Sequence, residues 1–130
     1  MTLEAVLELV AQTEFPFIKA GEDHGFTRIW IVEAEGRLFC RQYSFSSRSW
    51  YSAFQEDPHG YIRCGDEVIE IEGHIPADLS EITPKVNAAY LHKYGDVFPD
   101  NASIAHAMTG QKYVDKTMEL IPVVSGARAN

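Results

Sequence analysis

Apolar and polar residues alternate along most of the chain, and this pattern predicts a fold built mainly from short β-strands. The predicted strands are residues 15–20, 26–33, 37–43, 60–63, 67–74 and 113–122. Glu35-Gly36 and Gly65-Asp66 are turn pairs, so each closes a tight hairpin between the strands that flank it. Pro16 confines the first strand to a sheet edge or a strand start, because proline donates no ladder hydrogen bond.

Apolar residues at helical spacing predict helices between the strands. Thr2 caps a first helix, whose apolar side is formed by Leu3, Val6, Leu7 and Val10. A short helix follows at residues 50–55, after a serine-rich loop.

Thr83-Pro84 is typical of the cap and first position of a third helix, which we expect to end at Gly95. One face of this helix is formed by Val86, Ala89, Tyr90 and Lys93. Residues 98–108 have a mixed pattern and are predicted to hold one helical turn.

The order of elements is a helix, several antiparallel strands, a short helix, a hairpin, a helix and a last strand. This order predicts a mainly β, α+β fold, a small antiparallel barrel with helices on its outside, because closure leaves a short chain no unprotected sheet edges. We expect one domain over residues 1–130, with a frayed small and polar tail at 125–130.

Composition and charge exclude several classes of function. The chain has 130 residues, of which 45% are hydrophobic, and its net charge is −8 from 11 basic and 19 acidic residues. This is a globular composition, and its acidity argues against non-specific binding of nucleic acid or anionic membranes. We expect a soluble cytoplasmic protein without a signal peptide, in which Cys40 and Cys64 are buried free thiols.

The basic residues are concentrated in one part of the chain. Residues 36–54 contain no Asp or Glu and hold Arg37, Arg41 and Arg48, so this segment carries +3 and the rest carries −11. A small anionic ligand at one local site is therefore compatible with the acidic average. The alternative is that these arginines pair with acidic residues of other segments.

Capture of a phosphate is the sharpest chemical hypothesis for this segment. A strand ends at Arg41-Gln42-Tyr43, a serine-rich loop follows, and a helix begins at Ser49-Trp50, where unpaired N–H groups favour an anion. The hydroxyl groups of Ser46, Ser47 and Ser49 add donors, and Arg41 and Arg48 add charge and bidentate hydrogen bonds. The alternative is that Ser47 or Ser49 only caps the helix.

Aromatic residues surround the basic segment and favour a planar ligand beside the phosphate. They are Trp30, Tyr43, Phe45, Trp50, Tyr51 and Phe54. The alternative is that the last three form the inward face of a short helix, which we expect for Phe54. No histidines have the spacing of metal ligands, so we predict no metal site, and no sequence context identifies a catalytic residue.

Four runs of the sequence resemble an uncharacterised bacterial family of unknown function, which is related to the flavin- and deazaflavin-binding split β-barrels. The runs are residues 26–32, 36–41, 47–53 and 86–95, and the resemblance covers roughly residues 14 to 122. That superfamily includes the pyridoxamine-phosphate oxidases and the deazaflavin-dependent nitroreductases. The Trp50-Tyr51 pair at a helix start is the most specific feature, and it is similar to the Trp-Tyr motif of the deazaflavin-dependent reductases.

The resemblance implies a split barrel, a homodimer, and FMN or a deazaflavin in a groove between the barrel and its partner. The residues it suggests for cofactor binding are Thr27, Trp30, Arg41, Tyr43, Ser47, Arg48, Trp50 and Tyr51. Arg28 stands where that pattern has a proline, and the Arg-x-x-Leu-Lys type strand of the oxidases is missing. The resemblance therefore supports the same fold for this chain more strongly than it supports the same activity.

Three functions remain open at this point. The first is a flavin- or deazaflavin-dependent oxidoreductase that acts on a small organic substrate. The second is a non-catalytic module that binds a small anionic or planar ligand. The third is a structural dimer with no cofactor, in which the arginines pair with acidic residues.

Overall fold

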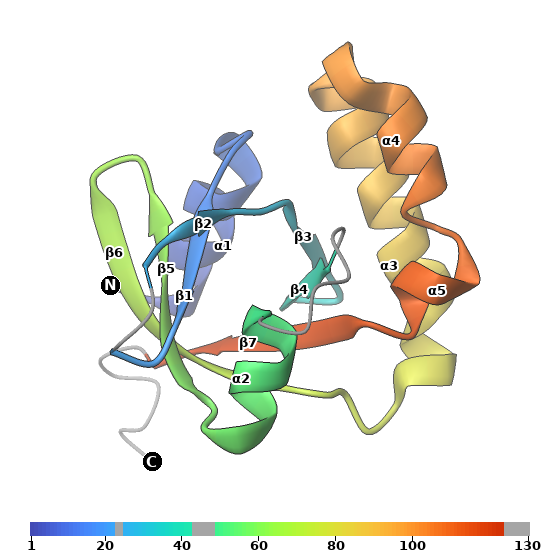
Figure 1. Ribbon diagram of the computed structural model, residues 1–130. Coiled ribbons are helices and arrows are strands. Elements are labelled where there is room, and N and C mark those ends of the chain that lie inside the picture. The colour runs from blue at the N-terminus through green and yellow to red at the C-terminus, as the bar shows by residue number, and fades with distance from the viewer. Residues whose placement is uncertain (23–24, 43–48, 124–130) are drawn as a thin grey trace.

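The computed structural model describes residues 1–22, 25–42 and 49–123, which form a curled seven-stranded antiparallel sheet with helices around it (Figure 1). The order of strands in the sheet is β2-β1-β5-β6-β7-β4-β3. The strands are β1 (Phe17–Ala20), β2 (Thr27–Arg28), β3 (Ile31–Ala34), β4 (Arg37–Arg41), β5 (His59–Cys64), β6 (Glu67–His74) and β7 (Thr117–Pro122).

The connection between β2 and β3 explains why the sheet curls. These two strands occupy opposite edges of the sheet, yet only Ile29 and Trp30 separate them in the chain. In a flat sheet the edges would lie about 29 Å apart at about 4.8 Å per strand, whereas three residue steps span at most about 11 Å. The sheet must therefore bend until its edges approach each other, as in the predicted split barrel.

Helices cover the ends and one side of this barrel (Figure 1). They are α1 (Leu3–Gln12), α2 (Trp50–Glu56), α3 (Leu79–Leu91), the π-helix η1 (His92–Val97), the 3₁₀ helix η2 (Pro99–Asn101), α4 (Ala102–Ala107) and α5 (Gln111–Val114). Thr2 caps α1 as predicted, with its hydroxyl oxygen accepting a hydrogen bond from the Ala5 N–H at 3.2 Å. Helices α3 and α4 pack against each other on one side of the molecule.

The sheet separates two hydrophobic cores. The first lies inside the barrel and joins α1 and α2 to the inward residues of the strands, including Leu38 and Cys40 of β4. The second lies outside β3 and β4, where Phe39 packs with Val86 and Tyr90 of α3. Leu38 and Cys40 therefore face one way and Phe39 the other, as alternate residues of a β-strand do.

Three of the predicted strands have other boundaries in the structure. The strand expected at 26–33 is broken into β2 and β3, because its halves pair with different neighbours at opposite edges. The strand expected from residue 113 begins only at Thr117, which pairs with Arg41, and residues 113–114 belong to α5. The strand predicted over 37–43 ends at Arg41, and Tyr43 lies outside the described residues.

The third helix also differs from its prediction. It begins at Leu79, so Pro84 lies inside the helix and not at its first position. Packing overrides the local preference, because Ile82, which precedes the proline, is buried in the second core. Gly95 does not end the helical chain either, since η1 continues to Val97 through a wider turn that buries both Lys93 and Tyr94.

Helix α2 docks on the sheet through Phe54, which lies over two glycines. A methyl group added to Gly73 of β6 would lie 2.7 Å from the Phe54 Cγ atom, and one added to Gly60 of β5 would meet the same ring. The ring therefore occupies space that only glycine leaves open. This contact fixes the position of α2, and with it Trp50 and Tyr51.

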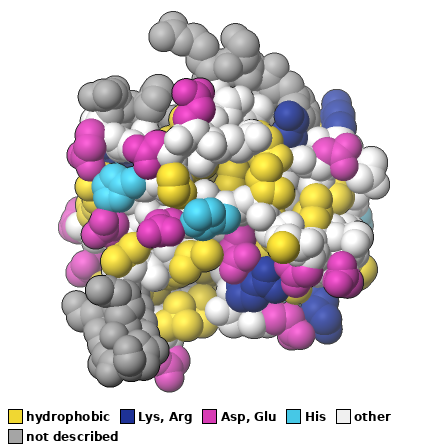
Figure 2. Space-filling view, turned by 90° about the horizontal axis from the view of Figure 1, so that it is seen from below, with side chains coloured by type: hydrophobic (Ala, Val, Ile, Leu, Met, Phe, Trp, Pro, Cys, Tyr) yellow, Lys and Arg dark blue, Asp and Glu magenta, His cyan; other side chains and the backbone are white. Residues whose placement is uncertain are grey.

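Acidic side chains are scattered over one face of the molecule. On the face shown in Figure 2, Asp and Glu side chains lie around the histidines, whereas Lys and Arg side chains are concentrated toward the other side of the view. None of the helices in the described ranges is long and apolar enough to cross a membrane. Within these ranges, no three His, Cys, Asp or Glu side chains are grouped to hold a metal ion.

Candidate functional site

Arg41, at the end of β4, is a buried arginine whose side chain is fixed by neutral partners. The residue is only 1% exposed. Its Nε atom donates to the Thr117 hydroxyl oxygen at 2.9 Å, and its Nη1 atom donates to the Asn87 side-chain oxygen at 2.6 Å and the Met108 carbonyl at 2.9 Å. The guanidinium also lies over the Tyr90 ring, 5.4 Å from its centroid. Contacts from β7, α3 and the end of α4 therefore set its orientation.

This guanidinium has no counter-charge among the described residues. No carboxylate of residues 1–22, 25–42 or 49–123 forms an ion pair with Arg41, and its Nη2 atom is buried without a hydrogen-bond partner. Burial lowers the pKa of Arg41, because desolvation disfavours the charged form. Buried charges in proteins are usually paired, so this guanidinium differs from most buried arginines in having no carboxylate partner among the described residues.

The next residue adds a second unsatisfied polar atom. The side-chain oxygen of Gln42 is buried and has no hydrogen-bond partner in the part of the chain that the structure describes. This oxygen accepts hydrogen bonds, whereas the Arg41 Nη2 atom donates them. Two consecutive residues thus leave a buried donor and a buried acceptor unpaired in the part of the chain that the structure describes.

Arg37 at the other end of β4 shows the contrasting arrangement. Its guanidinium donates to Asp78 at 2.9 Å and to Glu119 at 2.9 Å, so it is paired with two carboxylates. The alternative that the arginines of the basic segment pair with acidic residues of other segments therefore holds for Arg37. It does not hold for Arg41 among the described residues. Arg48 lies outside the described residues, as do Tyr43 and Ser47.

One of the aromatic residues predicted for the site, Trp30, shares a neighbour with Arg41. Tyr90, under the Arg41 guanidinium, donates its hydroxyl hydrogen to the Trp30 carbonyl at 3.0 Å. Trp30 itself stacks on Tyr94, with ring centroids 4.0 Å apart and an interplanar angle of 4°. One face of the Trp30 ring is therefore covered by Tyr94.

Tyr51 reaches the same region from α2. Its hydroxyl donates to the Asp115 carbonyl at 3.2 Å, two residues before the Thr117 that holds Arg41. Burial raises the pKa of Tyr51, so this hydroxyl stays protonated at neutral pH. Trp30 and Arg41 thus share the neighbour Tyr90 of α3, whereas Tyr51 belongs to the first core and contacts the segment that precedes β7.

The other predicted residues have different surroundings. Thr27 is exposed on the edge strand β2, where it pairs with Ile18. Trp50 is half-buried and contacts Tyr51 and Phe54 edge-on, at 6.1 and 6.4 Å between ring centroids. Phe54 is buried in the first core, which confirms the inward-facing alternative expected for it.

Ser49 uses its hydroxyl to cap α2. Its oxygen accepts a hydrogen bond from the Ser52 N–H at 3.2 Å, as in an ordinary N-cap. The alternative interpretation of the serine-rich loop is therefore confirmed for Ser49. The candidate site rests on Arg41 and its neighbours and not on this helix terminus.

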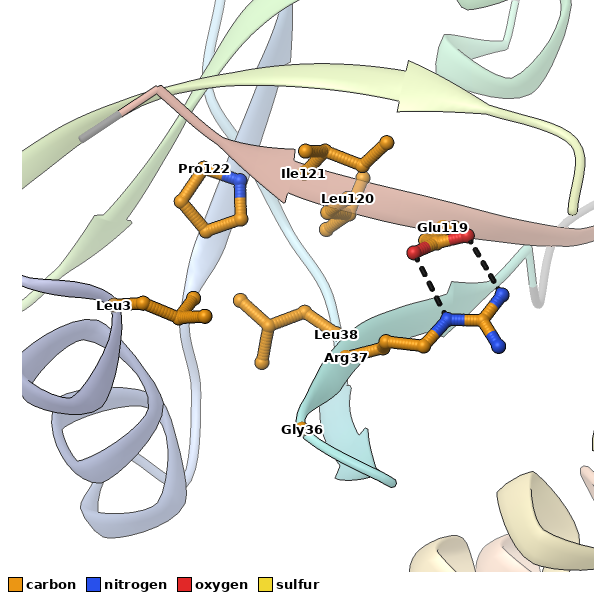
Figure 3. Close-up of a pocket in the computed structure, with 8 residues that line it drawn as sticks. All are labelled: Leu3, Gly36, Arg37, Leu38, Glu119, Leu120, Ile121 and Pro122. Carbon is orange, nitrogen blue, oxygen red and sulfur yellow. Dashed lines mark hydrogen bonds and ion pairs between the residues drawn. The ribbon is translucent and has the colours of Figure 1, made fainter. Parts of the chain in front are cut away.

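A pocket of about 270 Å³ lies elsewhere, between α1 and the β4–β7 pair (Figure 3). Its lining residues are Leu3, Gly36, Arg37, Leu38, Glu119, Leu120, Ile121 and Pro122. Figure 3 shows apolar side chains on its walls and the ion pair of Arg37 with Glu119 at one end. None of the residues predicted for cofactor binding lines this pocket, and its only arginine is already neutralised.

Lys93 is a second buried cation without an acidic partner in the described ranges. It is 6% exposed, and its Nζ atom donates to the carbonyls of Val10 and Ile31, both at 2.7 Å. It therefore joins the end of α1 to β3. Burial lowers the pKa of Lys93 from an ordinary 10.5 to about 8, because the charged form is poorly solvated.

This lowered pKa predicts a rise of stability at alkaline pH. Below pH 8 the Lys93 amine is charged in both the folded and the unfolded chain. Burial of this charge then lowers the free energy of unfolding. Between about pH 8 and 10.5 the folded state loses that proton before the unfolded state does, so the free energy of unfolding rises by about 3 kcal/mol. The neutral amine still has two N–H groups for its two carbonyl acceptors.

Urea unfolding of the wild type and of Lys93→Met at pH 7, 8, 9 and 10 measures this effect. Subtracting the free energy of unfolding of Lys93→Met from that of the wild type cancels the titration of the groups that both proteins share. We expect this difference to change in favour of the wild type as the pH rises. A difference that stays constant over this range would contradict the assignment.

Sequence reasoning missed the residues that hold Arg41. Asn87, Met108 and Thr117 are 46, 67 and 76 positions away along the chain, and no local motif marks them. For Lys93 a signal was present, since it is the one charged residue on the predicted apolar face of the third helix. A lysine in that position indicates a buried amine with carbonyl partners.

Known structures with this fold are recognisable at low sequence identity. A conserved hypothetical protein from Mycobacterium tuberculosis is similar over 95% of this chain and 80% of its own, with a TM-score of 0.60 and 15% identity. A provisionally assigned pyridoxamine 5'-phosphate oxidase from Listeria innocua is similar over 94% of both chains, with a TM-score of 0.59 and 10% identity. These likenesses concern the fold alone and confirm the predicted split barrel with flanking helices.

The family comparison agrees with the predicted resemblance. The model of a family described as "Uncharacterized protein conserved in bacteria (DUF2255)" matches residues 8–120. Among curated proteins, none matches this sequence. The resemblance to an uncharacterised bacterial family is therefore confirmed, and the similar structures show a split-barrel fold.

Proposed function

The chain belongs to the DUF2255 family of uncharacterised bacterial proteins, and we propose that its split barrel binds a phosphate-bearing planar cofactor, a flavin or a deazaflavin, at Arg41. The observation that carries this proposal is the buried Arg41 guanidinium, which has no carboxylate partner among the described residues and an unused Nη2 donor. A phosphate supplies the missing charge and accepts hydrogen bonds in the geometry that a guanidinium offers.

The surroundings of Arg41 suit an anion that becomes buried on binding. Thr117, Asn87 and the Met108 carbonyl hold two of the three guanidinium nitrogens, so the side chain pays little further entropy when the anion arrives. Water is excluded from a residue that is 1% exposed, which strengthens the attraction between the opposite charges. The Gln42 side-chain oxygen accepts a hydrogen bond from a donor on the ligand.

The residues present fit the phosphate end of such a cofactor better than its ring end. Trp30 has one face occupied by Tyr94, and Tyr51 is buried against the first core. When bound, the cofactor supplies hydride transfer, and the proposed reaction is oxidation or reduction of a small organic substrate. The name given to the similar Listeria innocua protein supports this class of chemistry.

A second candidate is a module that binds the same ligand without turnover. The partners of Arg41 are a hydroxyl, an amide, a carbonyl and a phenol ring, all neutral at pH 7. None of them is poised to move a proton in a reaction. These surroundings hold an anion equally well in a binding protein, so activity and binding have to be measured separately.

The visible absorbance spectrum of the purified protein tests the proposal. We expect flavin or deazaflavin absorbance that stays with the protein through gel filtration, and a phosphate-bearing cofactor in the mass spectrum after denaturation. If the protein is purified without cofactor, it should retain FMN or a deazaflavin after mixing and gel filtration. A protein that stays colourless with each of them contradicts the proposal, and bound cofactor without redox activity toward any acceptor selects the binding module.

A further inference from the structure

The pocket between α1, β4 and β7 forms where two strands separate (Figure 3). The ladder between β4 and β7 ends at the pair Leu38 and Leu120. Beyond this pair, Ile121 and Pro122 stay bonded to β6, whereas β4 turns away at Gly36 toward its hairpin with β3. The two strands therefore leave a gap of about 270 Å³ beside the start of α1.

The walls of this pocket are aliphatic, and part of this aliphatic surface is exposed. Leu38 and Leu120 are 1% exposed, whereas Leu3 and Ile121 beside them are 39% and 43% exposed. Exposed aliphatic side chains around a hollow favour an apolar molecule that covers them, because less apolar surface then faces water. A cavity of about 150 Å³ with such walls holds benzene, so this pocket has room for a chain of about six carbons.

The other end of the pocket is polar and has more negative than positive charge. Arg37 and Glu119 lie there, and Asp78 pairs with the same guanidinium (Figure 3). This cluster holds two carboxylates and one guanidinium. Hydrogen bonds from Arg37 lower the pKa of Asp78, so this carboxylate stays ionised at neutral pH and the cluster keeps one excess negative charge.

Hydrogen bonding at the polar end favours a ligand group that donates. The Arg37 Nε and Nη2 atoms donate to the two oxygens of Glu119 at 3.1 and 2.9 Å, and Nη1 and Nη2 donate to the two oxygens of Asp78, both at 2.9 Å. Each Glu119 oxygen thus accepts one bond from Arg37, and a carboxylate oxygen has room for a second. A ligand donor therefore finds acceptors here, whereas a ligand acceptor would lie beside two carboxylates.

We propose that this pocket binds a small aliphatic amine in its ammonium form, with the chain along the leucines and the ammonium group on Glu119. An ammonium group has three donors and no acceptor, and its charge balances the excess carboxylate. Figure 3 shows Leu3 and Pro122 at the end of the pocket away from Glu119, where the chain would lie. The inference does not depend on the Arg41 site, because none of the described residues proposed for cofactor binding lines this pocket.

Molecules of the same length with other head groups fit this pocket less well. The head group of a carboxylic acid would be repelled by Glu119, whose own partner Arg37 is already shared with Asp78. An alcohol would cover the same aliphatic walls but would gain no attraction between opposite charges. The net charge of −8 also attracts a cation to the protein and not an anion. Three ligands that differ only in the head group therefore separate these possibilities.

Titration of the isotope-labelled protein with n-hexylamine, n-hexanol and hexanoate at pH 7, followed by NMR, tests the proposal. We expect n-hexylamine to shift the backbone amide signals of Gly36, Leu38 and Ile121 until they saturate. Its dissociation constant should be at least about tenfold lower than that of n-hexanol, because a charged donor meets Glu119. Hexanoate should bind more weakly than n-hexanol. Hexanoate that binds as tightly as n-hexylamine, or an amine that causes no saturable shift at these residues, would overturn the proposal.

Two variants and one control separate the contact of the head group from that of the chain. Glu119→Gln keeps the shape of the side chain but removes its charge, so the preference for n-hexylamine over n-hexanol should fall close to one. Leu3→Trp places a large ring in the pocket wall at a part-exposed position, and it should weaken binding of both ligands at least about tenfold.

Glu56→Gln is the matched control, since it makes the same change of net charge at an exposed position of α2 outside the pocket. It should leave the affinities for n-hexylamine and n-hexanol unchanged. If Glu119→Gln fails to fold because Arg37 loses a partner, the three ligands with the wild type and with Leu3→Trp still decide the result. Binding of n-hexylamine that Leu3→Trp leaves unchanged would contradict the proposed site.

Discussion

Replacing Arg41 with methionine is expected to weaken FMN binding at least about a hundredfold, because a charge-assisted hydrogen bond to phosphate is lost. The same change should alter the free energy of unfolding by no more than about 2 kcal/mol. Removal of a buried unpaired charge offsets the hydrogen bonds lost to Asn87, Met108 and Thr117. Flavin fluorescence titration measures the binding, and urea unfolding of the cofactor-free proteins measures the stability.

Arg37→Met is the matched control for this variant. Arg37 lies on the same strand but is paired with Asp78 and Glu119, so its removal should lower stability and leave FMN binding unchanged. A loss of about 3–5 kcal/mol in Arg41→Met would indicate a buried ion pair instead of a ligand site. Equal FMN affinity in the wild type and Arg41→Met would show that the cofactor binds elsewhere.

Phe54→Ala is expected to lower the free energy of unfolding by about 3–5 kcal/mol, because it removes a buried ring that holds α2 on the sheet. Gly73→Ala should cost about 1–3 kcal/mol in the wild type, since its new methyl group would overlap the Phe54 ring. In the Phe54→Ala background the space is vacant, and the same glycine change should cost close to nothing. The double-mutant cycle in urea therefore isolates this contact.

Gly95→Ala is the control for the glycine change. An added methyl group at Gly95 meets no atom within 4 Å, and its backbone conformation is open to other residues, so stability should not fall. Additive effects of Phe54→Ala and Gly73→Ala would contradict the proposed packing.

Loss of the α2 contact should also weaken the hydrogen bond of Tyr51 to the Asp115 carbonyl, and near-ultraviolet circular dichroism of the aromatic residues reports this change.

Much of the fold was predictable because its strongest signals are local. The hairpin predicted around Glu35-Gly36 joins β3 and β4 in the structure, because a turn pair between two alternating segments is a signal carried by neighbouring residues. The turn at Gly65, with a φ of 61°, required the residue that the sequence has there.

The errors occurred where distant contacts override local preference. Residues 26–33 alternate as one strand does, but the sheet edges meet there and the chain crosses from β2 to β3 at Trp30. Pro84 favours a helix start, yet burial of Ile82 extends α3 to Leu79. The wide turn of η1 also has no local signature at Gly95, which usually ends a helix.

The candidate site was predictable only in part for the same reason. The acid-free segment identified Arg41 as a candidate for anion binding, because its charge pattern is visible in the sequence. The groups that orient it come from α3, the end of α4 and β7, and only the folded chain brings them together. Arg37 is paired with two carboxylates, whereas Arg41 has none among residues 1–22, 25–42 and 49–123, and this contrast depends on the same distant contacts.

A comparison of FMN with riboflavin tests most directly whether Arg41 receives the phosphate of a bound cofactor. The two ligands share the ring system and differ by the phosphate, so the ratio of their dissociation constants isolates the contribution of that group. By isothermal titration calorimetry we expect FMN to bind the wild type at least about a hundredfold more tightly than riboflavin, and this ratio to fall close to one in Arg41→Met. Equal affinities in the wild type, or a ratio that Arg41→Met leaves unchanged, would contradict the account.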